Sequence, residues 1–195
     1  MKITKVEVEM EVNSSNYLEL VVLSDLITSL NVTKVYSPKV IGTELKYVEG
    51  LFVPKWRSKR LEGTREVIGS VLPFLIEGDV KASLWFQSPH PQGGVPDVMM
   101  SFGWEVSVSD NIVNFAEPAW RIERIGRSVR LEGLWWKPDL VIEVKRTPKR
   151  ARTYPARKRL MVSLVEGEVT GWEVVELRSL REVIRKFIHE LAHVY

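Results

Sequence analysis

The sequence predicts an α+β fold in which a central mixed β-sheet is flanked by helices. Short segments that alternate apolar and polar residues, bounded by turn-forming residues, recur along most of the chain and are typical of strands. The last residues instead carry apolar side chains at helical spacing. The 195 residues are 45% hydrophobic, which is sufficient for one ordinary core. We therefore expect a single domain over residues 1–195.

The first third of the chain predicts mainly strands. The expected strands cover residues 5–12, 17–23, 32–36 and 44–53, with one short helix over 25–30. Residues 1–60 would thus form a β-rich N-terminal extension. Thr64 has the character of an N-cap, and we expect it to open a helix over about 64–76, which Pro73 bends or stops.

The rest of the chain predicts further strands and a terminal helix. The expected strands cover residues 80–87, 97–102, 105–108, 120–125, 129–134, 139–145, 160–165 and 172–177. A helix over 179–195 is indicated by a capping box, Ser179 with Glu182, and by an apolar stripe. The stripe consists of Leu180, Val183, Ile184, Phe187, Ile188 and Leu191.

Composition excludes several classes of protein. The chain has no cysteine, so disulfides, thiolate metal sites and a cysteine nucleophile are excluded. No apolar run reaches the roughly 18 residues that a membrane-spanning helix needs, and the N-terminus lacks the apolar segment of an export signal. We therefore expect a cytoplasmic protein without a membrane partner. The absence of cysteine together with abundant Val, Glu, Arg and Lys suits a thermophilic protein.

Positive charge is concentrated in one segment. Residues 145–159, KRTPKRARTYPARKR, contain 8 basic and no acidic side chains, so the net charge of +3 leaves −5 for the rest of the chain. Such a cluster is typical of a surface that contacts phosphates, and a solvated loop is the alternative. The candidate nucleic-acid contacts are Arg146, Lys149, Arg150, Arg152, Arg157, Lys158 and Arg159. Trp56, flanked by cations at 55–60, is a candidate for stacking on an unpaired base.

The strand over 139–145 is expected to have one buried and one chemically active face. Side chains alternate along a strand, so Leu140, Ile142 and Val144 would be buried. The other face would then carry Asp139, Val141, Glu143 and Lys145. A second Pro-Asp pair, Pro96-Asp97, also opens a strand. Two carboxylates suit Mg²⁺ or Mn²⁺, and a lysine beside them could orient water and offset the charge of a phosphate.

In these residues the sequence resembles the restriction-endonuclease-like, or PD-(D/E)xK, nuclease superfamily. Pro96-Asp97 corresponds to the PD element and Glu143-Val144-Lys145 to the ExK element. The resemblance covers residues 62–166 and implies a core of order αβββαβ, a metal ion held by Asp97 and Glu143, and Lys145 as the catalytic lysine. An acidic residue from the preceding helix would be Glu66. Pro138-Asp139 is an alternative PD element, which makes Asp139 another possible ligand.

The sequence thus favours a Mg²⁺-dependent nuclease that cleaves DNA or RNA, acting alone, as a homodimer or within a larger nucleoprotein complex. The alternative is a non-catalytic nucleic-acid-binding subunit of such a complex. A third reading is a zinc protease, because His189-Glu190-Leu191-Ala192-His193 matches the HExxH pattern, in which His189 and His193 would bind zinc. On the predicted helix these two histidines lie opposite the apolar stripe, as expected for a solvated face.

Overall fold

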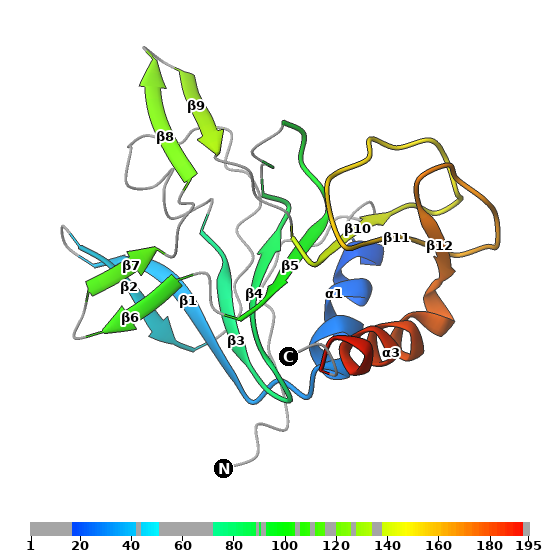
Figure 1. Ribbon diagram of the computed structural model, residues 1–195, viewed down its shortest axis with the longest axis horizontal. Helices are drawn as coiled ribbons and strands as arrows, with labels where there is room; N and C mark the ends of the chain where they lie inside the picture. Colours follow the sequence, from blue (N-terminus) through cyan, green and yellow to red (C-terminus); the bar gives the residue numbers. More distant parts are fainter. Residues whose placement is uncertain are drawn as a thin grey trace.

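The chain forms an α+β fold built on one large mixed sheet (Figure 1). The computed structural model describes residues 17–41, 44–50, 72–88, 90, 93–103, 106–109, 112–115, 120–125, 128–133 and 138–192. Within these residues it has an eight-stranded sheet, two hairpins and two α-helices, α1 (Tyr17–Ser29) and α3 (Leu180–Ala192). The predicted fold class is therefore confirmed at the level of a mixed sheet with flanking helices.

The large sheet has the strand order β12-β11-β10-β5-β4-β3-β1-β2. Its strands are β1 (Lys34–Ile41), β2 (Glu44–Glu49), β3 (Phe74–Glu77), β4 (Lys81–Phe86), β5 (Val98–Phe102), β10 (Leu140–Val144), β11 (Lys158–Ser163) and β12 (Glu173–Glu176). All neighbours from β2 to β10 pair antiparallel, whereas β10, β11 and β12 run parallel. A parallel pair needs a crossover connection, and residues 145–157 provide it between β10 and β11 without forming a helix.

Two hairpins form separate two-stranded sheets outside the large sheet, and one of them contacts β2 (Figure 1). One pairs β6 (Val106–Ser109) with β7 (Ile112–Phe115), and the other pairs β8 (Trp120–Ile125) with β9 (Ser128–Gly133). Both hairpins lie between β5 and β10 in the chain. Strands β5 and β10 are nevertheless adjacent in the large sheet, although about forty residues separate them in the chain.

The larger core lies between the sheet and the two helices, which pack against each other (Figure 1). Leu140, Ile142 and Val144 point into this core from β10, as their alternation predicts. Helix α3 buries Leu180, Ile184, Phe187 and Leu191 of its apolar stripe, so the predicted terminal helix is confirmed over Leu180–Ala192, and residues 193–195 lie outside the described residues.

A second core covers the opposite face of the sheet. Its buried residues are Trp85, Met99, Val141, Tyr154, Met161 and Trp172. Tyr154 comes from the crossover connection, which therefore covers this face in place of a helix. The side chains of β10 are thus divided by parity between two cores, with Val141 on the face opposite Leu140 and Ile142.

The strand predicted over 17–23 is wrong, because these residues begin α1. The segment is a nearly continuous apolar run, and periodicity alone does not separate a buried strand from a buried helix in such a run. The buried residues Val22, Leu23, Leu26 and Ile27 lie at helical spacing and face the larger core. Strands β1 and β2 extend the same sheet that contains β10.

The end of the helix predicted over 64–76 is also wrong. Phe74–Glu77 forms β3, which pairs with β1 and β4, because Pro73 ends any helix and the following residues find partners on both sides. Residues 64–71 and the strand predicted over 5–12 lie outside the described residues. Strand β7 was not predicted. No helix in the described part of the chain is long and apolar enough to cross a membrane.

Candidate active site

The end of β4, the start of β5 and the end of β10 lie side by side in the middle of the large sheet, and we call this border, which runs across the strand ends, the edge. β5 pairs antiparallel with β10, with Val98 opposite Ile142, so the start of β5 lies beside the end of β10. β4 also pairs antiparallel with β5 and ends at the same edge. The N–H of Gln87, just after β4, donates to the carbonyl of Asp97 at 2.8 Å and closes the loop between the two strands. Residues from distant parts of the sequence are therefore brought together here.

Asp97, Glu143 and Lys145 form one connected cluster at this edge. The Lys145 ammonium lies 2.7 Å from Glu143 Oε2 and 3.4 Å from Asp97 Oδ2. Asp97 Oδ2 also accepts a 2.6 Å hydrogen bond from the backbone N–H of Val144. Glu143 is 6% exposed, so the ion pair is largely shielded from water. The pairing of β5 with β10 thus places two carboxylates around a single ammonium.

The surroundings alter the acidity of these groups. Burial and the charge of Asp97 raise the pKa of Glu143, although the hydrogen bond from Lys145 opposes this. Burial alone would lower the pKa of Lys145, but the hydrogen bond to Glu143 and the charges of both carboxylates outweigh it and raise that pKa. Lys145 is therefore held as a cation between two carboxylates.

A third carboxyl group, Glu19 of α1, lies at the same edge. Gln87 donates its side-chain Nε2–H to Glu19 Oε2. Burial and then the charge of Asp97 raise the pKa of Glu19 to about 7, which places Glu19 within electrostatic range of the cluster. Sequence analysis missed both residues. Glu19 was assigned to a strand, and the left-handed φ of 46° at Gln87, which turns the chain at the end of β4, has no signal in the sequence.

Asp139 lies at the other end of β10. It accepts a 2.8 Å hydrogen bond from the Phe102 N–H through Oδ2, and its Oδ1 lies 3.2 Å from Arg157 Nε. These contacts join the start of β10 to the end of β5 and to the start of β11. Of the two Pro-Asp pairs, only Pro96-Asp97 therefore contributes a carboxylate to the cluster around Lys145.

The basic segment is divided between the two ends of the sheet. Arg146, Lys149, Arg150 and Arg152 are exposed on the crossover connection, which leaves the sheet at Lys145. Because β10 and β11 are parallel, the connection has returned to the opposite end when it reaches residue 157.

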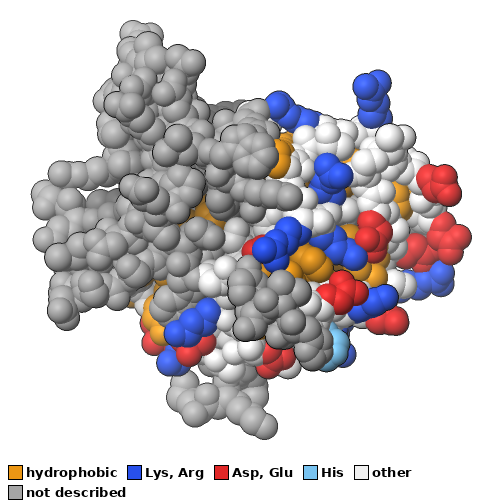
Figure 2. Space-filling view, viewed as in Figure 1, with side chains coloured by type: hydrophobic (Ala, Val, Ile, Leu, Met, Phe, Trp, Pro, Cys, Tyr) orange, Lys and Arg blue, Asp and Glu red, His pale blue; other side chains and the backbone are white. Residues whose placement is uncertain are grey.

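At that opposite end two cations have acidic partners. Arg157 pairs with Asp139, and Lys158 pairs with Glu173 at 2.9 Å, while Arg159 is half-buried. Figure 2 shows Lys and Arg side chains over the part of the molecule that carries β10, β11 and their connection, with acidic side chains beside them. The exposed cations early in the connection thus follow Lys145 of the Asp97–Glu143–Lys145 cluster in the chain, whereas residues 157–159 lie at the opposite end.

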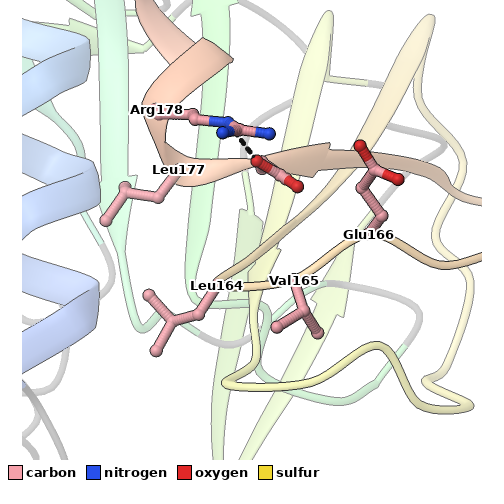
Figure 3. Close-up of a pocket in the computed structure, with 6 residues that line it drawn as sticks. Leu164, Val165, Glu166, Leu177 and Arg178 are labelled. Atoms are coloured by element: carbon pink, nitrogen blue, oxygen red, sulfur yellow. Dashed lines mark ion pairs between the residues drawn. The ribbon is translucent and has the colours of Figure 1, made fainter.

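Two open grooves of about 540 Å³ each flank β11 and β12. The first is lined by Leu164, Val165, Glu166, Glu176, Leu177 and Arg178, and Figure 3 shows the Arg178–Glu176 ion pair across its rim. The second is lined by Arg157, Lys158, Arg159, Gly171, Trp172, Glu173, Phe187 and Glu190. Neither groove has Asp97, Glu143 or Lys145 among its described lining residues, so this cluster lies outside both.

The remaining sequence candidates lie away from this edge or outside the described residues. Trp56, Glu66 and His193 fall in segments that the structure does not describe. His189 is exposed on α3, on the face opposite the helix's core residues. The described residues include no group of three or more His, Asp or Glu side chains that could hold a metal ion. The HExxH interpretation stays a prediction.

The carboxylates suit a hard divalent cation, with water completing the shell. Mg²⁺ usually keeps several waters and is bound through one or two carboxylates, which is what Asp97 and Glu143 could supply. Burial is the largest cause of the raised pKa values of Glu143 and Glu19, and the charge of Asp97 adds to both; a bound cation would offset the contribution of that charge. Comparisons with protein-family models, with curated proteins and with solved structures give no match to this chain.

Proposed function

We propose that this protein is a divalent-metal-dependent nuclease that hydrolyses phosphodiester bonds at the edge formed by the ends of β4, β5 and β10. The observation that carries the proposal is the convergence of Asp97 and Glu143 on the Lys145 ammonium, at 3.4 and 2.7 Å. Two carboxylates and a lysine on one sheet edge are the parts that metal-assisted phosphodiester hydrolysis needs.

The strand arrangement supports the same proposal. The PD-(D/E)xK resemblance implies the order αβββαβ. β4, β5, β10 and parallel β11 are consecutive neighbours in the sheet and follow α1 in the chain, with β1 to β3 inserted after α1 and the two hairpins inserted between β5 and β10. The crossover connection differs, because it contains Pro148 and Pro155 and forms no helix. Glu19, from α1, is the acidic residue that would join the cluster in place of Glu66.

Each side chain has a defined role in the proposal. Asp97 and Glu143 hold the cation, and the Val144 N–H fixes the Asp97 carboxylate by its 2.6 Å hydrogen bond. A bound divalent ion supplies Lewis-acid activation of water and neutralises phosphate charge. Lys145 donates hydrogen bonds from Nζ, orients the attacking water and offsets the negative charge on the phosphate oxygens. The exposed cations early in the connection attract the polyanionic substrate.

The test compares wild type with Glu143→Ala and Lys145→Ala on labelled single- and double-stranded DNA and RNA. Reactions contain Mg²⁺, Mn²⁺ or EDTA, and Asp139→Ala is the matched control at the opposite end of β10. We expect metal-dependent cleavage that both site variants lose and the control retains. Cleavage that survives in Glu143→Ala, or no cleavage of any substrate by wild type, would refute the proposal.

A non-catalytic nucleic-acid-binding function is the second candidate. The observation that favours it is the exposure of Arg146, Lys149, Arg150 and Arg152 on one connection. Under this alternative, gel shifts would show salt-sensitive binding that is unchanged by EDTA and by Glu143→Ala, with no cleavage.

A further inference from the structure

A turn of two glycines packs against the crossover connection close to the candidate site. Gly93 and Gly94 have φ angles of +83° and +88°, which glycine adopts without a steric cost. A Cβ built on Gly93 would lie 3.4 Å from Arg152 Nη1, and one built on Gly94 would lie 2.7 Å from Tyr154 Oη. The absence of side chains here therefore lets the connection approach the loop that leads into Asp97.

Tyr154 forms a rigid support beneath this contact. Its side chain is 4% exposed and belongs to the second core. The ring centroid lies 5.2 Å from that of the buried His90 and 6.0 Å from the Arg152 guanidinium carbon. A cation at this distance from an aromatic ring is weakly attracted to it. Arg152 is exposed, so its charged group lies at the surface between an anchored ring and the glycine turn.

The electrostatics place this arrangement beside the candidate site. After burial, the charges of Glu143 and Asp97 contribute to the raised pKa of Tyr154. Gly94 also precedes Asp97 by only three residues in the chain. Arg152 is therefore tied through Tyr154 and Gly94 to the edge that carries the carboxylates, whereas Arg157 pairs with Asp139 at the opposite end.

We propose that Arg152, supported by Tyr154 and the Gly93–Gly94 turn, binds a phosphate of the substrate strand next to the phosphodiester that is cleaved. This inference rests on the proposed nuclease function and names the cation that positions its substrate. A guanidinium presents a planar fork of donors that can hold two phosphate oxygens at once, which a lysine ammonium does not. Support from the turn and the ring reduces the side-chain freedom that is lost on binding.

The experiment compares Arg152→Ala and Arg152→Lys with Lys149→Ala, which removes another exposed cation of the same connection, and with the control Arg185→Ala, which removes an exposed arginine from α3. The substrate is the labelled DNA or RNA oligonucleotide that wild type cleaves fastest, and kcat and KM are measured separately. We expect Arg152→Ala to lower kcat/KM about tenfold or more. Arg152→Lys should recover substrate binding better than the rate of cleavage. Lys149→Ala removes one attracting charge and should lower kcat/KM less than Arg152→Ala does, whereas Arg185→Ala should stay within about threefold of wild type.

A second pair of variants tests the support. Tyr154→Phe keeps the ring and should resemble wild type, whereas Tyr154→Leu should resemble Arg152→Ala even though Arg152 is present. Thermal unfolding checks that Tyr154→Leu is folded at the assay temperature. If Arg152→Ala and Lys149→Ala reduce kcat/KM equally, the inference is wrong while the nuclease function stands.

Binding measurements distinguish a phosphate contact at Arg152 from the nuclease function. If wild type cleaves nothing, the nuclease function fails, and gel shifts with the same oligonucleotides in EDTA then decide the role of Arg152. A larger loss of affinity for Arg152→Ala than for Lys149→Ala would support a phosphate contact at Arg152. Equal losses would overturn it.

Discussion

Replacing Gly94 with alanine tests whether the loop before Asp97 is held against the crossover connection. Gly103→Ala is the matched control, because Gly103 has nearly the same backbone angle, φ +85° against φ +88°. A Cβ on Gly103 would meet no heavy atom within 4 Å, whereas one on Gly94 would lie 2.7 Å from Tyr154 Oη and 3.2 Å from Tyr154 Cε1. The two substitutions therefore share the backbone strain and differ in the collision.

The expected cost follows from these two contributions. An alanine forced to a left-handed φ costs about 1–2 kcal/mol in both variants. At Gly94 the new methyl group must also displace a tyrosine that is 4% exposed and packed in the second core, and overpacking of this kind costs about 1–3 kcal/mol. We therefore expect Gly94→Ala to be less stable than Gly103→Ala by about 2 kcal/mol.

Thermal and urea unfolding measure this difference. For a domain of this size, about 2 kcal/mol corresponds to a difference in Tm of roughly 4–8 °C. In the double variant Gly94→Ala with Tyr154→Phe, the atom at 2.7 Å is absent, so part of the loss should be recovered and the two changes should not be additive. Equal stabilities of Gly94→Ala and Gly103→Ala would refute the packing of the loop on Tyr154.

Three further predictions concern the charged and titratable groups. Lys145→Met should destabilise the protein by about 2 kcal/mol at neutral pH, because it leaves two shielded carboxylates without their ammonium. The control is Lys186→Met, which replaces an exposed lysine on α3. Equal losses of unfolding free energy for the two variants in urea would contradict the prediction. Burial, aided by the charge of Arg152, lowers the pKa of His90 to about 4. As the pH falls, the unfolded chain therefore protonates this histidine before the folded protein does. The free energy of unfolding should decrease by up to about 3 kcal/mol as the pH drops from about 6.5 towards 4. This part of the pH dependence should disappear in His90→Phe, and an unchanged slope of unfolding free energy against pH would disprove it. Asp139→Ala should lower the free energy of unfolding by about 1–2 kcal/mol, because it leaves the Phe102 N–H unpaired. Cleavage per folded molecule should equal that of wild type. Loss of cleavage would show that Asp139 belongs to the active site.

Local patterns in the sequence were sufficient where one segment determines its own structure. The stripe of α3 and the alternation of β10 each predict which side chains face the larger core, and both agree with the structure. The other face of β10 was expected to be exposed but is also buried, with Val141 in the second core and Glu143 6% exposed. The prediction of a strand over 17–23 was wrong because a nearly continuous apolar run has no period that distinguishes a strand from a helix. Its helical spacing becomes evident only once Val22, Leu23, Leu26 and Ile27 are seen facing the same core.

The sequence by itself determined that the chain has an α+β core, that positive charge is concentrated after Lys145, and that Glu143 and Lys145 share one face of a strand. Only the tertiary structure decided which carboxylates accompany them. The pairing of β5 with β10 brings Asp97 to this edge and leaves Asp139 at the other, and the packing of α1 adds Glu19.

The division of the basic segment was likewise decided in three dimensions. A crossover between parallel strands returns the chain to the opposite end of the sheet. Residues that are close in sequence, such as Arg152 and Arg157, therefore lie towards different ends of the strands. Pairing between distant strands depends on register and on the packing of both faces. No local pattern of residues encodes it, which is the physical reason that the composition of the site had to come from the fold.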